Sequence, residues 1–126
     1  GGYAALSLKN HSHPKIEKII AISPVVDFNN VQNISTLPNY LSTSHPGWYR
    51  FEEQEFNNFI QNSPKPNNEY PVNTIIIHGE FDEQIKVDDI EKYCQNFNTE
   101  LRLLKANHLS LNRLTRENLD VLDEIL

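Results

Sequence analysis

The stretch that decides the fold is Val72-Asn73-Thr74-Ile75-Ile76-Ile77-His78-Gly79-Glu80-Phe81-Asp82. Its first half, Val72 to Ile77, is rich in β-branched apolar residues, which is typical of a strand buried on both faces of a sheet. A glycine then permits a tight turn, and an aspartate follows just beyond the end of the strand. Catalytic groups and ligands of open parallel sheets gather at this carboxyl edge. We therefore expect Asp82 to occupy a functional position.

Two further strands are predicted along the chain. Ile16 to Ile22 is almost continuously apolar, and Glu100 to Leu104 alternates between apolar and other residues. Helical patterns surround them: one covers residues 3–10, one starts near Asp88, and one covers about 114–126. Strands that alternate with helices form a parallel sheet through right-handed crossovers. The predicted class is α/β, with about three parallel strands and flanking helices.

Residues 29–71 interrupt this alternation. The segment contains most of the prolines and a cluster of aromatic residues, and 48–60 could form one helix. Because it is longer than an ordinary crossover, we expect a cap-like helical insertion or an enlarged active-site edge. Trp48 and Tyr49 follow a Pro-Gly turn, and we expect them to line a substrate pocket, since ligand sites are mostly apolar. The alternative is that the aromatic residues form a small core of the insertion itself.

A histidine follows the third predicted strand as an aspartate follows the second. One helix and one strand separate Asp82 from His108, so parallel strands would bring both side chains to the same edge. A serine hydroxyl becomes a nucleophile when an imidazole takes its proton, and a carboxylate orients that imidazole. The structural alternatives are a turn aspartate for Asp82 and a loop or partly buried histidine for His108.

The serine of such a triad is expected outside the chain. Gly1-Gly2-Tyr3-Ala4-Ala5-Leu6 has the pattern that follows the serine in a Gly-Xaa-Ser-Xaa-Gly nucleophile elbow, which would place that serine two residues before Gly1. No serine within the chain has glycines at this spacing. On this interpretation the chain needs an N-terminal half. Alone it would expose a sheet edge, be poorly stable and lack hydrolase activity.

Three segments together resemble the α/β-hydrolase fold: Gly1 to Leu6, Ile22-Ser23-Pro24-Val25-Val26-Asp27-Phe28, and His78 to Ile85. Within that fold, residues 1–126 are most similar to the C-terminal part of the catalytic domain in the prolyl oligopeptidase and dipeptidyl aminopeptidase family. The resemblance implies that Asp82 and His108 are the acid and base of a serine peptidase. In that family such a histidine usually lies in a glycine-rich loop, whereas here it stands in Ala106-Asn107-His108-Leu109-Ser110.

Several alternatives remain beside this interpretation. Asp27 also follows a predicted strand at the same edge and is the alternative acid, although we expect it to cap the turn into the insertion. A carboxylesterase that cleaves small esters would use the same triad. A non-catalytic remnant or binding module would use none of it.

Composition and charge argue against other classes. The net charge is −6 without a cluster of Lys or Arg, which argues against a nucleic-acid partner. The single Cys94 excludes an internal disulfide and a cysteine-based zinc site. His11 and His13 have a metal-like spacing, but no carboxylate or cysteine is near them, and we expect a solvated loop. No apolar run approaches the roughly 20 residues that span a bilayer. We expect no cofactor, no metal and no membrane, and a peptide or small ester as the partner.

Overall fold

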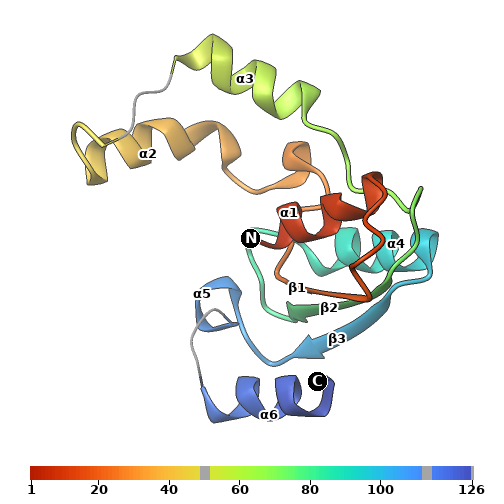
Figure 1. The fold of residues 1–126 in the computed structure, drawn as a ribbon. Coiled ribbons are helices and arrows are strands. Elements are labelled where there is room, and N and C mark those ends of the chain that lie inside the picture. Colours follow the sequence, from red (N-terminus) through yellow and green to blue (C-terminus); the bar gives the residue numbers. More distant parts are fainter. Residues whose placement is uncertain (49–51, 112–114, 126) are drawn as a thin grey trace.

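A computed structural model of the protein describes residues 1–48, 52–111 and 115–125. Its centre is a parallel sheet of three strands, β1 (Lys18–Ile22), β2 (Asn73–Gly79) and β3 (Glu100–Leu104), in the order β1-β2-β3 (Figure 1). Helices occur in both crossovers, so the predicted α/β class with parallel strands is confirmed. Within the described ranges, no strand pairs with the outer edge of β1.

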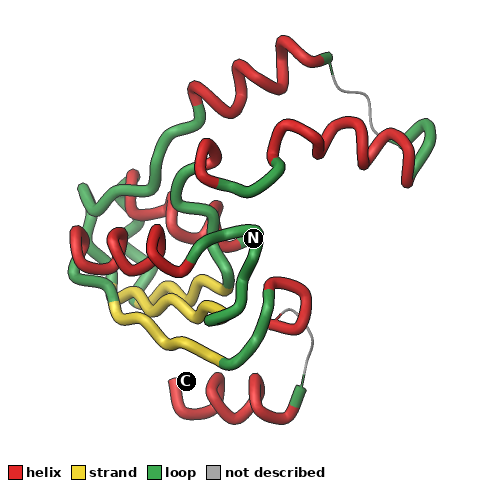
Figure 2. Tube along the Cα trace, turned by 180° about the vertical axis from the view of Figure 1, so that it is seen from behind, coloured by secondary structure: helices red, strands yellow, loops and turns green. Residues whose placement is uncertain are grey.

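Helices cover both faces of the sheet, as Figures 1 and 2 show from opposite sides. One face carries α1 (Gly2–Ser7) and α4 (Val87–Phe97), and the other carries α6 (Arg116–Ile125). The short helix α5 (His108–Leu111) follows β3 and contacts β2. Short 3-10 turns complete the fold at Leu8–Asn10 (η1), Phe28–Asn30 (η2) and Ile34–Thr36 (η3).

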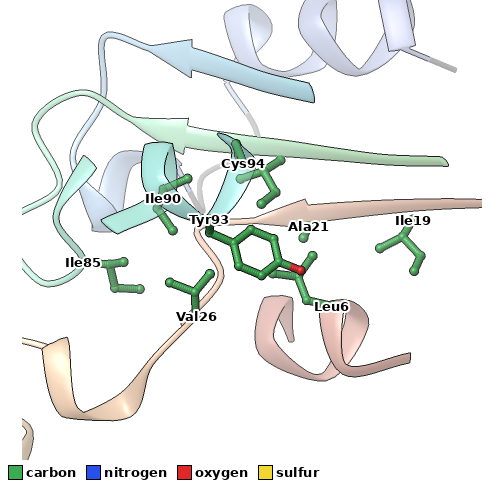
Figure 3. Packing of buried hydrophobic residues seen from close by; sticks show 9 residues of the cluster. Leu6, Ile19, Ala21, Val26, Ile85, Ile90, Tyr93 and Cys94 are labelled. Carbon is green, nitrogen blue, oxygen red and sulfur yellow. The ribbon is translucent and has the colours of Figure 1, made fainter. Parts of the chain in front are cut away.

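Two apolar clusters hold the sheet between these helices. The first lies under α1 and α4, where Leu6, Ile76 and Ile90 are fully buried, and Figure 3 shows several of its members. The second lies under α5 and α6 and is formed by Ile75, Ile77, Leu111 and Ile125. Because neighbouring residues of a strand point to opposite faces, the unbroken apolar run of β2 supplies both clusters. Burial of this strand on both faces is thus confirmed.

The long connection between β1 and β2 is helical. It contains α2 (Leu37–Ser44) and α3 (Glu53–Asn62), which lie beyond α1 and away from the sheet in both views. The predicted helix over 48–60 is wrong at its start, because α3 begins at Glu53. A helical insertion was expected over 29–71, but α2 was not predicted as a separate helix. Pro38 lies in its first turn, where a missing N–H costs no helical hydrogen bond.

The two ends of this insertion are joined at its base. Lys65 Nζ lies 2.7 Å from Asp27 Oδ2, so an ion pair links the segment before the insertion to the segment that follows α3. The ring of Phe28 packs on Tyr3 of α1 at 4.8 Å and on Phe59 of α3 at 5.1 Å between centroids. At this end the aromatic residues pack against one another and against α1. A cap-like role over a substrate stays a prediction.

The start of α1 lies in close contact with the end of β1. A Cβ atom on Gly2 would stand 2.7 Å from Pro24 Cα and 2.9 Å from the Ile22 carbonyl oxygen. Both distances are shorter than the contacts that Cβ atoms make in proteins. Only glycine therefore allows the helix to begin there.

We predict that Gly2→Ala lowers the free energy of unfolding by about 1–3 kcal/mol, the usual cost of overpacking. The added methyl group must push α1 away from β1. Urea denaturation measures the change, and Gly1→Ala is the matched control, because a Cβ on Gly1 has no atom within 4 Å. Equal effects of the two substitutions would show that the contact between the start of α1 and the end of β1 does not require glycine at position 2.

Candidate active site

Asp82 and His108 lie together at the carboxyl edge of the sheet, as their positions after β2 and β3 predicted. His108 Nδ1 is 2.8 Å from Asp82 Oδ2. An ionised carboxylate has no hydrogen, so the imidazole Nδ1–H is the donor. The Asp82 side chain is completely buried, whereas 24% of the His108 side chain is exposed. A buried acid therefore orients an imidazole that reaches the surface.

Backbone hydrogen bonds join the two loops that carry these side chains. Glu80 N donates to the Leu104 carbonyl at 2.9 Å, and Phe81 N donates to the Ala106 carbonyl at 3.0 Å. Gly79 makes this approach possible, because a Cβ there would collide with the Ala106 carbonyl. The turn after β2 is thus fixed against the end of β3.

The backbone that follows Asp82 orients its carboxylate. Asp82 Oδ1 accepts hydrogen bonds from the N–H groups of Gln84 and Ile85, each at 2.9 Å. Such a turn is a common role of aspartate, and it corresponds to the turn alternative considered for this residue. Here the two roles coincide, since Oδ1 closes the turn and Oδ2 contacts His108.

A second histidine, His78, supports this turn from the interior. Its ring is fully buried, and Nε2–H donates to the Ile85 carbonyl at 2.9 Å, while Nε2 lies 3.8 Å from Asp82 Oδ2. Burial lowers the pKa of His78, and the Ile85 carbonyl and the Asp82 charge oppose this only in part. His78 is therefore neutral and holds the loop between Asp82 and Ile85 in place.

A capping box fixes His108, at the position where members of the resembled family usually have a glycine-rich loop. Asn107 Oδ1 accepts from Ser110 N at 2.8 Å, and Ser110 Oγ accepts from Asn107 N at 2.9 Å. This places His108 as the first residue of α5. At the other end of α5, Asn118 Nδ2 of α6 donates to the Leu111 carbonyl at 3.2 Å. The Asn-Xaa-Xaa-Ser spacing is the pattern from which this cap could have been predicted.

A small cavity opens beside the imidazole. Its volume is about 150 Å³, and it is lined by Glu83, Gln84, Asn107, His108 and Leu109. Trp48, which was predicted to line a substrate pocket, is not part of this lining. Trp48 is 79% exposed and packs on the ring of His45 at 5.6 Å between centroids. Tyr49 lies outside the described residues, so the role of both as pocket residues stays a prediction.

Asp27, the alternative acid, has other partners. Its Oδ2 pairs with Lys65, and its Oδ1 accepts from Asn29 N at 3.0 Å, which caps the 3-10 turn η2. Burial raises the pKa of Asp27, but the Lys65 ammonium and the Asn29 hydrogen bonds together hold it below its usual value. The structure thus brings Asp82, and not Asp27, to His108.

The remaining candidates do not join this site. The rings of His11 and His13 lie 6.4 Å apart on an exposed loop. In the part of the chain that the structure describes, no three His, Cys, Asp or Glu side chains form a group that could hold a metal ion. Cys94 is buried in the core, where burial raises its pKa to about 11. None of the helices in the described ranges is long and apolar enough to cross a membrane.

Comparison of the sequence with models of known protein families and with curated proteins found no match. A partly exposed imidazole that is oriented by a buried carboxylate can accept a proton at its other ring nitrogen and return it. This arrangement favours acid–base chemistry at the carboxyl edge of the sheet.

We predict that His78 makes the fold sensitive to acid. In an unfolded chain an imidazole titrates near about pH 6.5, whereas burial lowers the pKa of His78 in the fold. Below about pH 6.5 the unfolded chain therefore binds a proton that the folded chain does not, and the free energy of unfolding decreases as the pH falls.

Urea unfolding of the wild type and of His78→Gln across this range measures the effect. Glutamine keeps a donor for the Ile85 carbonyl but does not titrate. Relative to the variant, the wild type should lose stability progressively as the pH falls from neutral. A difference between the two that stays constant with pH would show that His78 is not held neutral by the fold.

Proposed function

We propose that this chain supplies the acid and the base of a serine hydrolase that cleaves amide bonds in peptides. The observation that carries the proposal is the hydrogen bond of 2.8 Å between His108 Nδ1 and Asp82 Oδ2. Because Nδ1–H donates to the carboxylate, the proton-accepting role falls on Nε2, the nitrogen that faces the serine hydroxyl in a triad. The choice of amide bonds rests on the resemblance to the peptidase family.

The proposed reaction follows the usual course of acyl transfer. His108 Nε2 takes the proton of a serine hydroxyl while the serine oxygen attacks the carbonyl carbon of the substrate. The imidazolium then gives the proton to the leaving amine, and an acyl-enzyme remains. A water molecule repeats the attack with the same base and releases the acid. Throughout, Asp82 keeps the ring in one tautomer and stabilises its positive charge.

The position of α1 supports a serine two residues before Gly1. Gly2 packs against the Ile22 carbonyl and Pro24, so α1 begins at the carboxyl end of β1. The loops of Asp82 and His108 leave the sheet at the same edge (Figure 1). A strand-to-helix turn that ends at Gly1 would present its serine toward this edge.

Serines within the described residues are less suited to this role. The hydroxyl of Ser110 is part of the cap with Asn107. Ser23 follows β1 with a φ of 41°, and its Oγ is buried without a hydrogen-bond partner among the described residues. However, Pro24 and a loop follow Ser23, and a nucleophile elbow requires a helix there.

Labelling with a fluorophosphonate probe tests the proposal. We expect no labelled serine in residues 1–126 alone, and one labelled serine in a longer polypeptide in which the residues encoded upstream precede Gly1. In the longer polypeptide, His108→Ala and Asp82→Asn should slow labelling by roughly 10³-fold or more. Asp27→Asn is the matched control and should have little effect, because Asp27 pairs with Lys65.

Two results would overturn this proposal. One is a labelled serine in residues 1–126 that disappears in Ser23→Ala or Ser110→Ala. The other is a longer polypeptide whose labelling does not depend on His108. A panel of peptide and ester substrates then decides the bond type, and cleavage of esters without any cleavage of peptides would replace the peptidase by the carboxylesterase.

A further inference from the structure

A buried lysine lies at the end of the sheet opposite Asp82 and His108. Lys9 stands in η1 directly after α1, and the whole residue is only 1% exposed. Its Nζ is 3.5 Å from the hydroxyl oxygen of Thr99, which precedes β3, and 5.8 Å from the centroid of the Tyr93 ring. Neither of these neighbours carries a negative charge at neutral pH.

An ammonium group in such a place needs an anion, because burial of an unpaired charge is strongly unfavourable. None of the ion pairs among residues 1–48, 52–111 and 115–125 includes Lys9. Burial lowers the pKa of Lys9, and Cys94 opposes this only in part. Burial also raises the pKa of Cys94 to about 11, so its thiol supplies no charge at neutral pH.

A cavity of about 260 Å³ opens beside Lys9. Its polar lining consists of Lys9, Asn68, Asn73, Asn98 and Thr99, and the other lining residues are apolar. This lining combines one ammonium, three carboxamides and one hydroxyl, all of which can donate hydrogen bonds, and it includes no carboxylate. Donors of this kind around a cationic group are the set that recognises oxyanions through charge-assisted hydrogen bonds.

We propose that Lys9 and this cavity bind a small oxyanion, of which inorganic phosphate is the simplest member. The Lys9 ammonium pairs with the anion, while the Thr99 hydroxyl and the carboxamides of Asn73 and Asn98 donate hydrogen bonds. The bound anion fastens η1 to the starts of β2 and β3. The site lies at the amino edge of the sheet, so it does not depend on the function proposed for Asp82 and His108.

An NMR titration of the full chain with sodium phosphate, at constant pH and ionic strength, tests this proposal. We expect saturable shifts of the backbone amides of Asn98 and Thr99 and of the Asn73 carboxamide. The melting temperature should rise with phosphate, because a ligand that binds only the folded state stabilises it. Lys9→Met should abolish both responses, and Lys15→Met, which removes an exposed lysine, should leave them unchanged.

A second variant keeps the test independent of any damage caused by the loss of Lys9. Asn98→Asp puts a carboxylate into the lining at nearly constant size, and aspartate tolerates the left-handed backbone of this position, where φ is 47°. It should raise the melting temperature without phosphate and remove most of the rise that phosphate causes.

Three results would overturn the proposal. The first is a phosphate response of Lys9→Met equal to that of the wild type. The second is a set of shifts that does not saturate and follows the exposed lysines, which indicates an adventitious ion only. The third is a response centred on His108, which would place the anion at the candidate active site.

Discussion

The close approach of Gly79 to the Ala106 backbone is the constraint on which the candidate site depends. In the parallel pairing of β2 with β3, Gly79 lies opposite Leu104, so the two strands end side by side. A side chain at Gly79 would force the following loops apart. Without it, the backbone after β2 bonds to the backbone after β3, and Asp82 comes within hydrogen-bond distance of His108. Because Gly79 has no Cβ atom, the loops that follow β2 and β3 can approach closely enough for Asp82 to contact His108.

Several hydrogen bonds hold the buried Asp82 carboxylate in one orientation. Two backbone N–H groups bind Asp82 Oδ1, the His108 imidazole binds Oδ2, and neutral His78 ties the same turn to the interior. A buried polar group without partners costs about 1–3 kcal/mol, so such a network favours one arrangement of the loop over others. The same reasoning makes Lys9 notable. Hydrogen-bond donors surround this buried lysine, and no negatively charged side chain among the described residues pairs with it.

The sequence alone was enough for the parts of the fold that depend on local pattern. The apolar run of β2 indicated burial on both faces, and the alternation of strands and helices then implied that Asp82 and His108 share one edge. Features that depend on tertiary contacts were missed. The sequence indicated a helical insertion but not the bounds of α2, and nothing in it showed that Lys9 would be buried beside Tyr93 of α4. The cap between Asn107 and Ser110 is local, and its spacing was open to prediction.

The NMR spectrum of the His108 ring gives the most direct test of the candidate site. A proton on Nδ1 that is hydrogen-bonded to a carboxylate is deshielded and protected from exchange with water. We predict such a resonance in the full chain, lost in Asp82→Asn and retained in Asp27→Asn, because Asp27 pairs with Lys65 instead. Its absence from the wild type, or its loss in Asp27→Asn with retention in Asp82→Asn, would contradict the assignment of Asp82 as the partner of His108.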